Sequence, residues 1–244
     1  MGLRLRLGML TPSSNTVLEP VTYDLLRGLD GVTAHFARFE VTRISLDAAG
    51  LAQFDPEPIL TAARLLAHAK CDVIAWNGTS ASWLGFEQDE ALVRAIETDT
   101  GIPAATCVLG YRDLFRAMNV KRFGLVTPYT DDVQDRIVAN WQRAGLNCIG
   151  ERHCGITDNF AFAEIAEVEI ERMVRAVALG ADAVAIVCTN MRGWRVASQI
   201  QRETGTPVLD SVVVTLWAAL QRVGAGHLLD PTLGWLGGTA SSRA

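Results

Sequence analysis

The chain has 244 residues, of which 49% are hydrophobic and 20% charged, and its formal net charge at pH 7 is −5. This composition predicts a globular protein with a large core, and the scattered lysines and arginines argue against a nucleic-acid partner. No apolar run reaches the length of a membrane span and no secretory signal is evident, so we expect a cytoplasmic protein without a membrane partner.

The cysteines and histidines do not form a recognisable metal motif. The five cysteines are an odd number without a CxxC pair, and the four histidines are scattered without an HExxH motif. In the cytoplasm such cysteines are expected to be reduced thiols. No glycine-rich phosphate loop or GxSxG motif occurs either. We therefore expect no metal, no nucleotide cofactor and no serine nucleophile.

Apolar runs rich in strand-forming residues alternate with helical periods along the whole chain. The helical periods include residues 59–69 and 167–179. This alternation predicts an α/β protein with parallel sheets covered by helices on both faces. The expected strands lie near residues 3–11, 32–41, 71–77, 104–108, 122–127, 147–153, 183–188 and 207–210.

Three segments of the first part of the chain recur, in the same order, in the second part. LGMLTPSSN (7–15) matches FGLVTPYTD (123–131), DVIAWNGTS (72–80) matches DAVAIVCTN (182–190), and TGIP (100–103) matches TGTP (204–207). We infer two similar Rossmann-like (flavodoxin-like) parallel-sheet halves related by pseudo-twofold symmetry. One half would comprise residues 1–110 plus 213–244 and the other residues 111–212.

The repeat also predicts where a ligand binds. Ligands of open α/β sheets bind beyond the carboxyl ends of the strands, so the loops at 11–16, 78–83, 127–132 and 188–194 would surround one cleft between the halves. In this alignment Gly78 is the counterpart of Cys188, and each precedes a threonine. One side of the cleft would therefore carry a thiol and the other no side chain. This disfavours a reaction in which one thiol removes a proton from one face of a carbon and a second thiol returns a proton to the other face.

Cys188 is the candidate catalytic residue. It follows an apolar run and is expected to begin a helix, whose N-terminal dipole would lower the thiol pKa or hold an anion beside it. The alternative is an inert, buried cysteine. Thr79 and Ser80 offer two hydroxyls and successive N–H groups that suit a carboxylate or an enolate oxygen, although both residues also favour helix N-caps. Trp83 and Trp194 are expected to shape the pocket.

Several short motifs together give the chain a family resemblance over essentially its whole length. The two halves, the paired thiol positions and the CTN segment (188–190) resemble the aspartate/glutamate racemase superfamily. PSSNT (12–16) is similar to the maleate cis–trans isomerase branch. GTSASW (78–83), YTDDVQDR (129–136) and GIT (155–157) are similar to arylmalonate decarboxylase. That decarboxylase also has glycine where racemases carry their first catalytic cysteine.

The resemblance implies roles for individual residues. Cys188 would be the proton donor. Thr79, Ser80 and Tyr129, with the backbone N–H groups of Cys188 and Thr189, would bind the carboxylate that becomes an enediolate. The isomerase branch implies instead that Asn15, Tyr129 and Asn159 hold the substrate carboxylates, and its first cysteine, the usual nucleophile, corresponds to Gly78. The polar Thr189–Asn190 segment and Asn15 depart from the decarboxylase pattern, so a smaller or more polar diacid fits as well as an aryl-substituted one. The candidate substrate-binding residues are Ser14, Asn15, Gly78, Thr79, Ser80, Tyr129, Asn159, Thr189 and Asn190.

The expected function is cofactor-independent decarboxylation of a 2-substituted malonate through an enediolate, which a single cysteine protonates. The alternatives are a maleate-type cis–trans isomerase or related racemase acting on a small dicarboxylate, and a diacid-binding protein without turnover. In each case the partner is a small dicarboxylate, and the family is compatible with a homo-oligomer.

Overall fold

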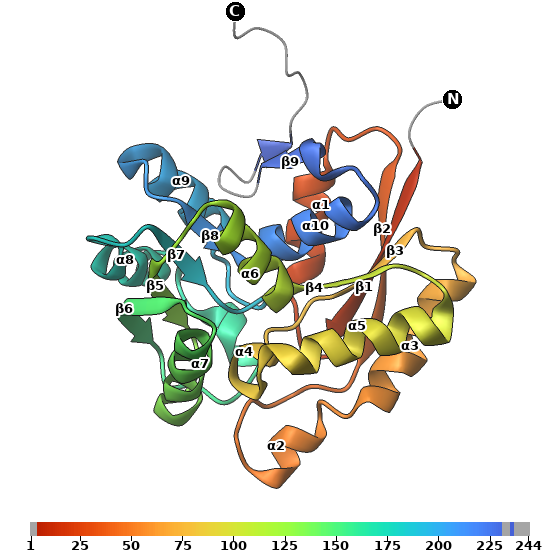
Figure 1. Ribbon diagram of the computed structural model, residues 1–244, viewed down its shortest axis with the longest axis horizontal. Helices are drawn as coiled ribbons and strands as arrows, with labels where there is room; N and C mark the ends of the chain where they lie inside the picture. The colour runs from red at the N-terminus through yellow and green to blue at the C-terminus, as the bar shows by residue number, and fades with distance from the viewer. Residues whose placement is uncertain (1–3, 231–234, 237–244) are drawn as a thin grey trace, which may run out of the picture.

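Two parallel sheets form the framework of the protein, whose computed structural model describes residues 4–230 and 235–236 (Figure 1). Each sheet has four strands, and all eight expected strands are present. The first sheet contains β1 (Leu5–Pro12), β2 (Val32–Phe39), β3 (Val73–Trp76) and β4 (Ala104–Thr106). The second contains β5 (Arg122–Thr127), β6 (Asn147–His153), β7 (Ala183–Ile186) and β8 (Val208–Asp210).

The two sheets repeat the same topology. Their strand orders are β2-β1-β3-β4 and β6-β5-β7-β8, and every neighbouring pair is parallel. The repeat extends to single ion pairs. Asp72 accepts from the backbone N–H of Arg6 at 2.7 Å, and Asp182 accepts from that of Arg122 at 2.8 Å. Each aspartate also binds the arginine guanidinium. The predicted two-halved architecture is therefore confirmed.

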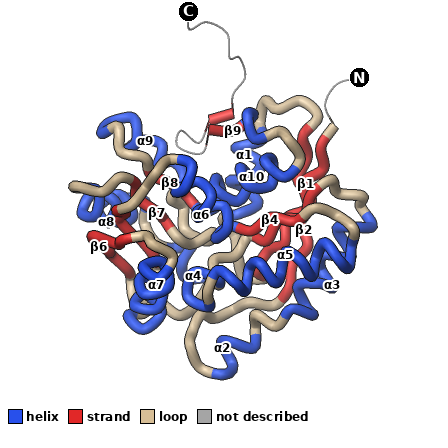
Figure 2. The backbone as a smooth tube through the Cα atoms, in the orientation of Figure 1, coloured by secondary structure: helices blue, strands red, loops and turns tan. Residues whose placement is uncertain are grey.

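Helices cover both sheets, as Figure 2 shows. In α8 the buried residues Ile170, Met173, Val174 and Val177 follow the three- and four-residue spacing of one helix face, which packs against β5 and β6. The helices are α1 (Leu18–Leu26), α2 (Ala48–Ala52), α3 (Pro56–His68), α4 (Ala81–Leu84), α5 (Phe86–Thr100), α6 (Cys107–Ala117), α7 (Asp131–Arg143), α8 (Glu167–Ala178), α9 (Trp194–Thr204) and α10 (Ser211–Arg222). Short 3₁₀ turns lie at η1 (Phe160–Glu164) and η2 (Gly226–Leu228), and β9 (Leu229–Asp230) pairs with β10 (Trp235–Leu236).

Two helices, α6 and α10, connect the halves. Thr106 accepts from the N–H of Leu109 and so caps α6, whose Tyr111 hydroxyl donates to the carbonyl of Ile186 in the second sheet at 2.7 Å. In return α10, which follows β8, packs against β3 and β4 of the first sheet. This exchange is in keeping with the expected division into 1–110 plus 213–244 and 111–212, which stays a prediction. Residues 231–234 and 237–244 of it lie outside the described part.

Within the described residues, no helix is both long and apolar enough to cross a lipid bilayer.

The aspartate that caps α10 makes stability depend on pH. Asp210 is 1% exposed, and its Oδ1 accepts from the N–H groups of Val212 and Val213 at 2.9 and 3.3 Å. Its Oδ2 has no hydrogen-bond partner among the described residues. Burial raises the pKa of this carboxyl from 3.8 to about 7. The folded protein therefore favours the neutral carboxyl, whereas the unfolded chain ionises it from about pH 4 upward. The free energy of unfolding consequently falls as the pH rises from about 4 through 7.

We expect Asp210→Asn to remove this pH dependence, because asparagine caps a helix equally well and does not ionise. Between pH 5 and pH 8 the wild-type protein should lose about 2–3 kcal/mol more unfolding free energy than the variant. Urea unfolding of both proteins at the two pH values measures the difference. The same change in both proteins would show that Asp210 does not titrate in this range.

Candidate active site

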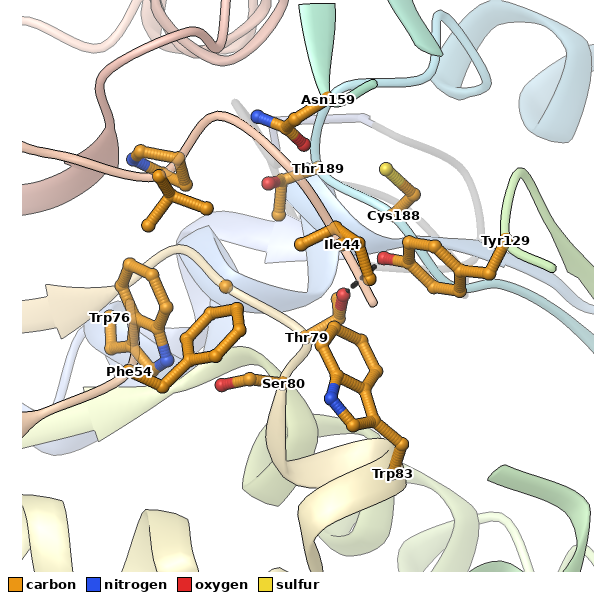
Figure 3. A pocket seen from close by; sticks show the side chains of 13 residues that line it. Ile44, Phe54, Trp76, Thr79, Ser80, Trp83, Tyr129, Asn159, Cys188 and Thr189 are labelled. Carbon is orange, nitrogen blue, oxygen red and sulfur yellow. Dashed lines mark hydrogen bonds between the residues drawn. The ribbon is translucent and has the colours of Figure 1, made fainter. Parts of the chain in front are cut away.

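A small cavity lies between the two halves, at the carboxyl ends of the strands (Figure 3). Its walls come from the segments that follow β1, β2, β3, β5, β6 and β7. The volume is about 20 Å³, which is room for about one water molecule. None of the lining residues is charged. A dicarboxylate in this cavity would therefore be bound by neutral donors.

The Cys188 thiol faces this cavity from the second half. It is 3% exposed, and its sulfur accepts from the backbone N–H of Asn190 at 3.4 Å. Burial raises the pKa of the thiol to about 12, although the bonds from Asn190 and Tyr129 act in the opposite direction. Cys188 is consequently a protonated thiol at neutral pH.

The expectation that a helix begins at Cys188 was wrong. A turn spans residues 188–191, and α9 begins at Trp194. The thiol is therefore separated from the helix N-terminus, and its pKa is raised rather than lowered. The sequence pattern located the thiol and misjudged its ionisation, because it could not show the length of the turn or the depth of burial.

Beside Cys188, hydroxyl groups from both halves meet. Thr79 Oγ1 and Tyr129 Oη are 2.6 Å apart, and both residues are buried. Burial raises the pKa of the Tyr129 hydroxyl, so it too is protonated at neutral pH. Ser80 also lines the cavity, and its side chain makes no cap to α4. Ser80 therefore does not serve as a helix cap, and its hydroxyl is available to a ligand.

Three asparagines connect the two halves beside the cavity. Asn15 donates from Nδ2 to Thr189 Oγ1 at 3.1 Å, and its Oδ1 caps the start of α1. The Thr189 hydroxyl itself donates to the carbonyl of Asn77 at 2.9 Å. Asn190 donates to the backbone oxygen of Asn159 at 2.6 Å and accepts from the N–H groups of residues 16 and 17. Thr189 and Asn159 line the cavity, whereas Asn15 and Asn190 lie behind this lining.

Ser14 likewise lies behind the lining rather than in it. Its hydroxyl donates to the carbonyl of Val41 at 2.6 Å and accepts from Asn159 Nδ2 at 2.7 Å. These bonds orient the Asn159 amide at the cavity wall. Ser14, Asn15 and Asn190 are thus placed to position the residues that touch a ligand, and the structure gives their polar atoms partners within the protein.

The remaining wall is apolar and was largely missed in the sequence. Val41, Ile44 and Phe54 come from the segment after β2, and Trp76 and Trp83 stand on either side of Ser80 in the chain. The segment after β2 crosses to the second half, where the N–H of Ile44 donates to the carbonyl of residue 157 at 2.8 Å. The only signal for it was its position after a strand end. Trp83 lines the cavity as expected, whereas Trp194 does not.

The Trp83 indole supplies a further donor. Its Nε1 is buried and has no hydrogen-bond partner among the described residues. The ring packs edge-to-face against Tyr129 at 5.1 Å and Phe54 at 5.8 Å, and its nitrogen is turned toward Ser80 (Figure 3). An unpaired buried N–H is costly, so a ligand oxygen or a water molecule is expected beside it.

No group of three histidine, cysteine, aspartate or glutamate side chains within the described ranges is arranged to hold a metal ion.

Comparison with known proteins shows which family the chain belongs to. The family model for arylmalonate decarboxylase matches residues 34–231. The chain belongs to the arylmalonate decarboxylase family. The arylmalonate decarboxylase of Bordetella bronchiseptica is 30% identical over 184 residues, which cover 74% of this chain and 77% of that protein. The maleate isomerase of Pseudomonas putida is 26% identical, with 92% of this chain and 97% of the relative covered.

Solved structures of both enzymes share the fold. A doubly substituted arylmalonate decarboxylase in its liganded form superposes with a TM-score of 0.80, at 25% identity and with 94% and 97% of the two chains covered. A Nocardia farcinica maleate cis–trans isomerase mutant, with a covalently bound succinylcysteine intermediate, gives 0.86 at 21% identity, covering 95% and 97%. Relatives of this chain thus catalyse two different reactions. The residues that line the cavity are the evidence for which of the two this chain would catalyse.

The burial of Cys188 predicts low reactivity toward alkylating reagents, because the thiolate is the reactive form. Iodoacetamide at pH 8 should modify the half-buried Cys148 and Cys154 first, and Cys188 at least about tenfold more slowly. The rate at Cys188 should rise with pH up to pH 9 without a plateau. Mass spectrometry of the modified peptides gives the rates. A plateau near pH 7 would show an activated thiolate instead.

Proposed function

We propose that this protein decarboxylates a 2-substituted malonate without a cofactor and protonates the product from Cys188. The observation that carries the proposal is a single, buried, protonated thiol that faces a cluster of hydroxyl groups, with Gly78 where a second thiol would stand. A protonated thiol is suited to donating a proton and poorly suited to nucleophilic attack.

One carboxylate of the malonate would bind at the polar side of the cavity. The hydroxyls of Thr79, Ser80 and Tyr129 converge there, and Trp83 Nε1 adds an unpaired donor. Thr79 and Tyr129 share one hydrogen bond, and Tyr129 also interacts with the Cys188 thiol; when Tyr129 donates to Thr79, the Thr79 proton is the one that points to the ligand. These donors are held by the fold before the ligand arrives, which is the arrangement that stabilises developing negative charge most effectively.

The other carboxylate would lie against the apolar wall. Val41, Ile44 and Phe54 offer it no hydrogen-bonding side chain, and poor solvation of the anion favours its loss as neutral CO2. The bond between C2 and this carboxylate breaks, and its electron pair moves into the retained carboxylate to form a planar enediolate. The second negative charge of that enediolate falls on oxygens in contact with the hydroxyl cluster.

Protonation then occurs from one face. The Cys188 thiol transfers its proton to C2, and the enediolate electron pair forms the new C–H bond. The resulting thiolate accepts the N–H of Asn190 and interacts with Tyr129 until a solvent proton restores the thiol. Because Gly78 has no side chain to act from the other face, the product is a single enantiomer if the substrate binds in one orientation.

Isomerisation of maleate is the second candidate. Its support is that several relatives are maleate isomerases, that Asn159 lines the cavity, and that the PSSNT segment lies beside it, with Ser14 bonded to Asn159. This reaction requires Cys188 to add as a thiolate to a double bond. The raised pKa of Cys188 and the absence of a charged lining residue weigh against it. A diacid-binding protein without turnover is the third candidate.

The proposal is tested by incubating the purified protein with methylmalonate, phenylmalonate and maleate, while CO2 and fumarate are followed separately. We expect CO2 from a malonate and no fumarate. Cys188→Ala should lower kcat by at least about 10³-fold because it removes the proton donor. Cys154→Ala, which changes a half-buried thiol outside the cavity lining, is the matched control and should keep the wild-type rate.

Each contrary result has a definite meaning. Full activity in Cys188→Ala would refute its role as the proton donor. Fumarate without CO2 would establish the isomerase, and binding of a diacid without either product would establish the binding protein.

The raised pKa of Cys188 also predicts the pH profile of the reaction. A donor must be protonated, and a pKa of about 12 keeps the thiol protonated through the neutral range, so its loss begins only as the pH approaches 12. We expect kcat to be constant between pH 6.5 and pH 9 for a malonate that is fully ionised there. A pH-rate profile at saturating substrate measures this. A decline with a midpoint near pH 8 would contradict the buried, neutral donor.

A further inference from the structure

The space next to Gly78 is filled by the side chain of Trp76. A Cβ atom placed on Gly78 would lie 1.9 Å from Cζ2 and 2.3 Å from Cε2 of the Trp76 ring. Gly78 is not among the glycines with a positive φ, so its backbone conformation does not itself require glycine. The indole is therefore the group that excludes a side chain at this position.

Trp76 is held firmly by its surroundings. It is 1% exposed and ends β3, where it pairs with Leu10 of β1 on one side and Thr106 of β4 on the other. Its ring packs against Phe39 with the centroids 5.1 Å apart. A tryptophan in the middle of a sheet and packed on an aromatic ring has little freedom to move aside, because protein cores are close-packed.

Trp76 also lines two cavities. One is the cavity of about 20 Å³ that contains Cys188. The other is a second cavity of about 200 Å³, and Phe54, Trp76 and Ser80 line both. The second cavity is lined further by the apolar residues Ile59, Leu84 and Leu92 and by the polar residues Gln88 and Asp89. Figure 3 shows Trp76 and Phe54 at one side of the catalytic cavity and Cys188 with Tyr129 at the other.

We propose that Trp76 is the specificity-determining residue of this cavity. Its indole occupies the space that a second thiol at position 78 would need, and it limits the substituent on the reacting carbon to a small group such as methyl. The inference rests on the proposed decarboxylation. It names the substrate class more narrowly, as a malonate with a small 2-substituent, and it assigns the second cavity as the room that a larger substituent would take if the indole were smaller.

The role of Trp76 is tested by the preference of the enzyme for small or large 2-substituents on the malonate. For the wild-type protein, kcat/KM should be higher for methylmalonate than for phenylmalonate. Trp76→Leu should shift the ratio toward phenylmalonate by at least about tenfold, because the two cavities then join. Trp141→Leu is the matched control. Trp141 is fully buried in the aromatic cluster of the second half, away from both cavities, and its replacement should leave the ratio unchanged.

Whether the Trp76 indole fills the space next to Gly78 is tested separately, by thermal stability. Gly78→Ala adds only a Cβ, and we expect it to lower Tm by about 5 °C through overpacking against the indole. In the Trp76→Leu background the same change should have almost no effect. Thermal unfolding of the two single variants and the double variant gives this coupling. An equal loss of Tm in both backgrounds would refute the steric role of Trp76.

The two experiments separate this inference from the proposed function. If the wild-type protein releases CO2 from a malonate but Trp76→Leu leaves the ratio unchanged, the specificity role is wrong and the decarboxylation stands. If no malonate is decarboxylated, the proposed function is wrong. In that case calorimetry gives the dissociation constants of methylmalonate and phenylmalonate. If Trp76→Leu leaves the ratio of these two constants unchanged, the inference is also wrong.

Discussion

The hydrogen bond between Thr79 and Tyr129 depends on the alignment of the two halves, and the cavity depends on the same alignment. The two residues are 50 positions apart in the chain and follow strands of different sheets. Cys188 comes from the second sheet and the apolar wall from the first, so neither half contains a complete site. Two sets of bonds across the interface hold this alignment beside the cavity: Asn15 donates to Thr189, and Asn190 accepts from the backbone N–H groups just before α1.

The same alignment explains the chemistry of the thiol. A cleft between two packed halves excludes water, and the residues that line it are uncharged. Exclusion of water raises the pKa of Cys188 and Tyr129 together, so the site contains protonated donors rather than anions. It is also the condition under which fixed dipoles stabilise an anionic intermediate most strongly. Burial thus sets both the proton donor and the electrostatic stabilisation of the intermediate.

The fold was predictable because its signals are local or repeated. Apolar runs marked all eight strands, and the internal repeat brought Gly78 and Cys188 to the two sides of one cavity. The segment containing Val41 and Ile44 was not predictable, since its course depends on bonds to the second half. The number of residues between Cys188 and α9 likewise depends on tertiary packing. One feature was readable and overlooked: Trp76 and Gly78 are two residues apart at a strand end, where side chains share a face.

The exchange of α6 and α10 between the halves has a consequence for biosynthesis. The first sheet is complete at Thr106, but the face of it formed by Val73 and Ala75 packs in one apolar cluster with Val213 and Leu216 of α10. A ribosome delivers those residues about a hundred positions later, at roughly 5–20 residues per second. During synthesis α1 is the first helix available to this apolar cluster, and the part that α10 covers stays exposed until α10 has emerged.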